Sequence, residues 1–127
     1  MATPAIDTAS YDAVVTSDDT PTIIALIMPE TGWYGQVSAV IHAYSTEDKT
    51  VCASFVVRGV AKRVSGTATV QLTGMYDFDS TIELQGISAE LAPGTYEGGN
   101  HVLLMATGHA TIELEWHVRT TTMFEAA

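Results

Sequence analysis

Basic residues are scarce in this sequence. Its 127 residues include 5 lysines and arginines against 15 aspartates and glutamates, which gives a formal net charge of −10 at pH 7. Proteins that bind nucleic acid present a basic surface to the phosphates. The composition therefore argues against DNA or RNA as a partner.

Long hydrophobic runs are missing as well. The longest aliphatic run is Ile23–Met28, whereas a membrane-spanning helix needs about 20 apolar residues. The first residues have neither the basic charge nor the hydrophobic stretch of a secretory signal peptide. We therefore expect no membrane partner and synthesis in the cytoplasm.

Cysteine occurs once, as Cys52, which excludes an internal disulfide. No histidine lies beside it in sequence, and we interpret it as a small packed residue of a strand. The sequence also lacks a Gly-x-Ser-x-Gly elbow, a His-Glu-x-x-His motif, a phosphate-binding loop and a dinucleotide fingerprint. We expect no enzymatic activity and no cofactor; a carboxylate pair assembled only by the fold remains an open alternative.

Two groups of residues have weak metal-binding patterns. Asp77 and Asp79 form an acid pair in an expected loop, but two carboxylates fall short of the six to eight oxygens that Ca²⁺ takes. Glu113, Glu115 and His117 alternate along one expected strand, about 7 Å apart, and ligands in such a row rarely converge on one ion. We expect no metal site, with Asp77 and Asp79 as the only candidates.

The sequence is rich in β patterns. Segment 36–44 alternates, and the last strand does so too, with Trp116 as the expected largest core residue. The inward positions are Val37, Ala39, Ile41 and Ala43 in the first, and Ile112, Leu114, Trp116 and Val118 in the second. The expected strands span residues 22–28, 36–44, 51–60, 67–72, 81–88, 101–107 and 110–120, with loops at 30–35 and 89–100.

About eight short strands without helical periodicity predict an all-β fold, an antiparallel β-sandwich that is jelly-roll-like. Strands 36–44 and 51–60 are expected to form a hairpin, and Ile82 and Leu84 to share one face of their strand. The length indicates one domain. We assign residues 1–11 to a flexible N-terminal arm, 12–120 to the sandwich and 121–127 to a C-terminal tail.

The order of several motifs along the chain carries information about its family. Thr20-Pro-Thr22 opens an aliphatic strand, and a later strand ends in Val-Val-Arg-Gly-Val-Ala-Lys-Arg63. A strand that ends at Thr107-Gly108 then precedes a final strand with a central Trp116. From about residue 17 to 120 the chain resembles the small β-sandwich domain of tailed-bacteriophage virion proteins, of the capsid-decoration or tail-fibre type. The match departs from the pattern between residues 77 and 100.

The resemblance implies a structural or attachment role in a virion. Our leading interpretation is a capsid decoration (cement) protein on the outer capsid surface, forming a homotrimer or homodimer and binding the major capsid protein. The alternative is a receptor- or carbohydrate-binding module of a tail fibre, tail tip or head fibre, with a surface glycan or receptor as partner.

Eight residues are interface candidates, for three different reasons. Exposed aromatic side chains anchor interfaces or stack on sugars, arms order on binding, and four of the five cations lie between residues 49 and 63, opposite a stretch of acids in 64–118. The aromatic candidates are Trp33 and Tyr34, which alternatively cap the core; the arm candidates are Tyr11, Met123 and Phe124; the basic candidates are Arg58, Lys62 and Arg63, which alternatively only solubilise the surface.

Overall fold

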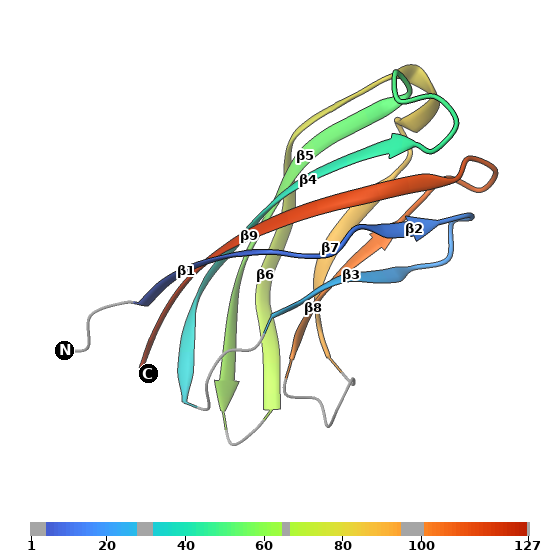
Figure 1. Ribbon diagram of the computed structural model, residues 1–127. Coiled ribbons are helices and arrows are strands. Elements are labelled where there is room, and N and C mark those ends of the chain that lie inside the picture. Colours follow the sequence, from blue (N-terminus) through green and yellow to red (C-terminus); the bar gives the residue numbers. More distant parts are fainter. Residues whose placement is uncertain (1–4, 28–31, 65–66, 95–100, 127) are drawn as a thin grey trace.

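The computed structural model describes residues 5–27, 32–64, 67–94 and 101–126, and these form a two-layer β-sandwich (Figure 1). The larger sheet has the order β1-β9-β4-β5-β6, with β2 also paired to β9; the smaller sheet has the order β3-β8-β7. All pairs are antiparallel. The predicted all-β sandwich is confirmed. None of the described residues form a helix long and apolar enough to cross a membrane.

The elements of the described chain follow the order β1 (Ala5–Ser10), β2 (Val14–Thr16), β3 (Thr22–Ile27), β4 (Trp33–Ser45), β5 (Cys52–Val64), β6 (Thr67–Ser80), the 3₁₀ helix η1 (Ile82–Leu84), β7 (Ser88–Pro93), β8 (Val102–Thr107) and β9 (Leu114–Ala126). The second strand, β2, pairs with the last strand, β9, and the third strand, β3, pairs with β8, which precedes β9 in the chain. The expected hairpin of 36–44 and 51–60 is present as β4 and β5.

Alternation of side chains along the strands builds the core between the sheets. The four inward residues predicted in β4 are all fully buried: Val37, Ala39, Ile41 and Ala43. Trp116 is 1% exposed, as predicted, and packs edge to face against Phe55 with ring centroids 6.4 Å apart. Its indole N–H donates a 2.8 Å hydrogen bond to the Thr16 hydroxyl, so the largest core side chain has no unsatisfied polar atom.

Side chains close both seams between the sheets. On one side, the Leu91 amide of β7 donates to the Thr73 hydroxyl of β6, at 3.0 Å. On the other side, the Tyr11 hydroxyl donates to the Leu26 carbonyl of β3, at 3.3 Å. These contacts give hydrogen-bond partners to backbone groups of the edge strands β7 and β3, beyond which the strand pairing of the smaller sheet does not continue.

The chain ends are more ordered than the sequence suggested. Ala5–Ser10 of the expected arm form β1, which pairs with Arg119–Phe124, and the expected tail continues β9 to Ala126. Residues 5–10 of the expected flexible arm and 121–126 of the expected tail thus lie in paired strands. Small and polar residues carry little hydrophobic periodicity, yet their backbone groups pair along an edge as well as any others. Residues 1–4 and 127 lie outside the described part.

Three further expectations fail between residues 72 and 94. A strand was expected over residues 81–88, but residues 81–87 form none. In the 3₁₀ helix η1, Ile82 is 78% exposed and Leu84 is fully buried, because residues two positions apart in such a helix point in different directions. Residues 89–93 of the expected loop belong to β7 instead, which spans Ser88–Pro93. Strand β6 runs on to Ser80, so Asp77 and Asp79 lie in a strand rather than a loop.

Candidate interaction surface

The larger sheet has one face turned away from the core, which we call the outer face. It is formed by the even-numbered side chains of β4 and β5, the odd-numbered side chains of β9 from Glu115 to Glu125, and their partners on β1, β2 and β6. Because paired residues point the same way, the register arranges this face in rows that cross the strands. One row, for example, consists of Ile6, Met123, Gln36, Val60 and Leu72.

Exposed apolar side chains gather on the outer face. Among the described residues, eight large hydrophobic side chains are exposed, and seven of them have register positions on this face. These seven are Ile6, Val15, Tyr34, Val40, Leu72, Tyr76 and Met123, whereas Ile82 lies elsewhere, on η1. Single exposed apolar residues are ordinary, but seven on one sheet face make this face the candidate interaction surface.

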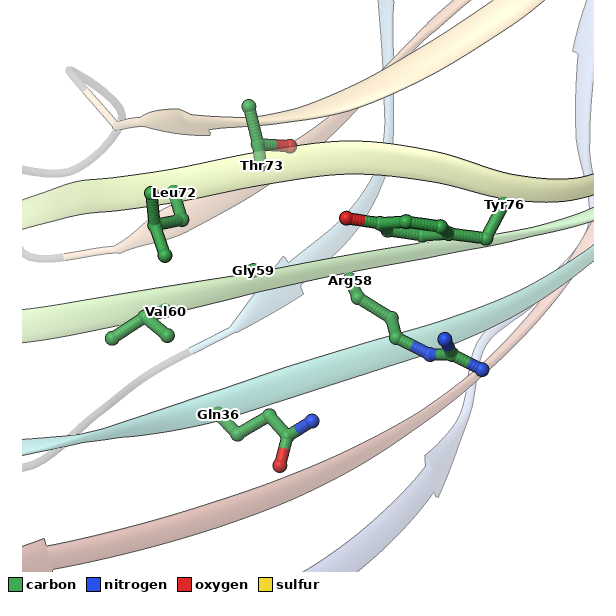
Figure 2. Close-up of a pocket in the computed structure, with 7 residues that line it drawn as sticks. All are labelled: Gln36, Arg58, Gly59, Val60, Leu72, Thr73 and Tyr76. Atoms are coloured by element: carbon green, nitrogen blue, oxygen red, sulfur yellow. The ribbon is translucent and has the colours of Figure 1, made fainter.

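A hollow on this face lies over β4, β5 and β6 (Figure 2) and has a volume of about 470 Å³. The Tyr76 ring lies close to Gly74, where a Cβ atom would come within 2.9 Å of the tyrosine hydroxyl. The Arg58 guanidinium carbon is 5.2 Å from the ring centroid, a cation–π distance. Leu72 and Val60 complete an apolar wall beside this pair.

A polar cluster occupies the end of the outer face near the β4–β5 turn. The Tyr44 hydroxyl donates to the Glu115 carboxylate, and the His117 Nε2 lies 2.7 Å from the same carboxylate oxygen. The Tyr44 and His117 rings stack with centroids 5.4 Å apart, and the Lys49 ammonium lies 5.4 Å from the Tyr44 ring centroid. Hydrogen bonds from Tyr44 and from His117 both lower the pKa of Glu115, and the bond from Tyr44 has the larger effect.

Of Glu113, Glu115 and His117, which were expected to alternate along one strand, only Glu115 and His117 lie on β9. Glu113 precedes β9 and instead accepts hydrogen bonds from the hydroxyls of Thr46, at 2.9 Å, and Ser17, at 3.2 Å. Among the described residues, no group of three or more histidines, cysteines, aspartates or glutamates could hold a metal ion. Asp77, at a bulge of β6, has the positive φ of 54°.

The opposite end of the outer face separates the two neighbouring aromatics. Tyr34 is 41% exposed and donates a 2.9 Å hydrogen bond to Glu125, and this bond raises the pKa of Tyr34. Trp33 points the other way and is half-buried against the core. Because β4 already begins at Trp33, adjacent side chains fall on opposite faces, so one aromatic lies on each side.

The remaining interface candidates also fall into two groups, those exposed on the outer face and those that point toward the core. Arg58 and Lys62 are exposed on the outer face, whereas Arg63 is half-buried and lies in register with Trp33. Met123 is 41% exposed on the outer face, but Phe124 is 8% exposed and belongs to the core. Phe124, predicted as an apolar anchor of the tail, is therefore a core residue in this structure.

Tyr11, predicted as an anchor in the flexible N-terminal arm, packs against the body of the fold. Its half-buried ring packs against the core, and its hydroxyl bridges Leu26 and Thr120. The sequence analysis did not identify the outer face as a surface. Val40, Leu72 and Tyr76 were not singled out, because only strand register shows that they lie together with Ile6 and Met123.

Comparison with known proteins adds a fold relationship. No family profile and no curated protein sequence matches the chain. Among solved structures, the fold is similar to part of the tailspike protein of Acinetobacter baumannii phage AM24, with a TM-score of 0.50, at 10% sequence identity. The similarity covers 94% of this chain and 26% of the tailspike chain. This chain therefore has the fold of a β-sandwich that also occurs within a larger phage protein.

Proposed function

We propose that this chain is a structural protein of a bacteriophage particle that acts by binding and not by catalysis. The observation that carries the proposal is the outer face, a sheet surface on which seven exposed large apolar side chains gather. It is supported by the resemblance of the sequence to phage virion sandwich domains and by the fold similarity to a phage tailspike over 94% of the chain. A single sandwich with a large contact face fits a protein whose work is attachment.

Two positions in the particle fit this function, and each has its own support. A capsid decoration protein needs a compact body with one broad surface that contacts the shell, and the outer face supplies such a surface. A receptor- or carbohydrate-binding module of the tail is favoured by the tailspike similarity. The hollow beside Tyr76 and Arg58 combines an aromatic ring with hydrogen-bond donors, which suits a sugar ligand.

Copy number in purified particles tests the function and separates the two positions. The experiment quantifies this chain against the major capsid protein by gel densitometry and by mass spectrometry of labelled peptides. Hundreds of copies per particle would support capsid decoration, and a few to a few tens would support a tail position. Particles that lack the chain would refute the proposed function altogether.

A further inference from the structure

The outer face differs in charge from the rest of the protein. By strand register it carries three cations and three carboxylates, Arg58, Lys62, Arg119 and Asp79, Glu115, Glu125. This face is therefore formally neutral, and the net charge of −10 comes from the remainder of the chain. Contact between two such faces brings no net charge together, so it adds no local repulsion to that between two acidic chains.

The face is also large enough for a stable contact. Its six rows span about 33 Å along the strands, and its five strands about 19 Å across them. The resulting area, roughly 600 Å² in projection, is comparable with the about 800 Å² of accessible surface that each partner contributes to a standard interface. Burial of the exposed apolar side chains in its rows would supply the affinity.

The distribution of residues across the face favours one geometry. Suppose that the outer faces of two copies pack against each other about a two-fold axis. An axis perpendicular to the strands would place Glu125 opposite Glu115 of the second copy. An axis along β4, the central strand, instead sets β5 of one copy against β9 of the other. Lys62 then meets Glu125, because both are in register with Tyr34 of β4.

The same axis also matches apolar side chains with each other. In the next row, Val60 meets Met123 and Leu72 meets Ile6, since the two members of each pair lie the same number of strands away from β4, on opposite sides. Val40 lies on the axis and meets its own copy.

We infer that the outer face is the contact surface between two copies of this chain, packed face to face about a two-fold axis along β4. This inference goes beyond the proposed function, because it concerns self-association of the isolated protein, in which no capsid or receptor competes for the outer face.

Sedimentation equilibrium of the purified full chain tests the inference. We expect a concentration-dependent mass that approaches twice the 13.5 kDa of one chain. Val40→Glu should raise the dissociation constant at least tenfold, because two carboxylates would face each other across the axis. Ile82→Glu is the matched control, since Ile82 is an equally apolar, exposed residue away from the outer face. Circular dichroism and thermal unfolding would verify that both variants are folded.

A charge exchange tests the direction of the axis. Lys62→Glu should weaken the dimer, because it opposes Glu125 of the second copy, and the double variant Lys62→Glu with Glu125→Lys should restore it. A wild-type protein that remains monomeric at millimolar concentration would overturn the inference. It would also be overturned if Ile82→Glu weakened association as much as Val40→Glu, or if the double variant associated no better than Lys62→Glu alone. None of these outcomes depends on the presence of the chain in particles.

Discussion

Replacement of Thr16 by valine isolates one buried hydrogen bond of the core. Thr16 and Trp116 are 4% and 1% exposed, and the indole N–H donates to the Thr16 hydroxyl at 2.8 Å. Valine keeps the shape of threonine but removes the acceptor. The indole N–H is then buried without a partner, which costs about 1–3 kcal/mol. A domain of this kind has a total stability of about 5–15 kcal/mol, so the loss would be easy to measure.

A double-mutant cycle separates the hydrogen bond from other effects of the substitution. Trp116→Phe removes the donor but also leaves a void beside Phe55, so its own cost includes packing. When Thr16→Val is introduced into the Trp116→Phe background, no donor is left unsatisfied. We therefore expect the valine to cost less there by about 1 kcal/mol or more.

The assay is equilibrium urea unfolding followed by far-ultraviolet circular dichroism, which does not depend on the tryptophan that is replaced. The midpoints of the four proteins, with a common slope, give the free energies of the cycle. A Thr16→Val protein within 0.5 kcal/mol of the wild type, or a coupling free energy of zero, would refute the reasoning. Either result would mean that the bond between β2 and β9 does not contribute to stability.

Three other predictions follow from the structure. Gly59→Ala should strongly reduce the free energy of unfolding, because its Cβ would collide with the backbone carbonyl of the paired strand β6, whereas Gly86→Ala, with open space around it, should have little effect; urea unfolding compares the two. Phe124→Ala should cost about 3–5 kcal/mol and Met123→Ala far less, since only the former side chain is buried, and equal melting temperatures would contradict this. The folded pKa of Glu115 lies below its unfolded value, so its ionised form stabilises the protein at pH above the unfolded pKa, and this contribution is lost as the pH falls through the folded pKa. Urea midpoints in the acidic range should accordingly fall less for Glu115→Gln than for the wild type.

The sequence alone determined the parts of the fold that depend on local periodicity. In β4, small apolar residues alternate with polar ones, and a side-chain period of two is sufficient to assign the buried face. The position of Trp116 in phase with Leu114 and Val118 predicted its burial in the same way. The class of fold then follows, because strands with one apolar face must cover it with a second sheet.

Local periodicity was insufficient where strands lie at edges or contain bulges. β1 has no apolar alternation, and only its backbone pairing with β9 makes it a strand. Register shifts in β6 hide its continuation past Leu72, because each bulge reverses the side-chain alternation.

The candidate surface was decided by tertiary structure alone. Ile6, Val40, Leu72, Tyr76 and Met123 come from the four strands β1, β4, β6 and β9, and each by itself is an ordinary exposed apolar residue. They share one face because the register of four strand pairs aligns them. Register is set jointly by core packing across the two sheets and by bulges, which are properties of the whole fold and of no single segment.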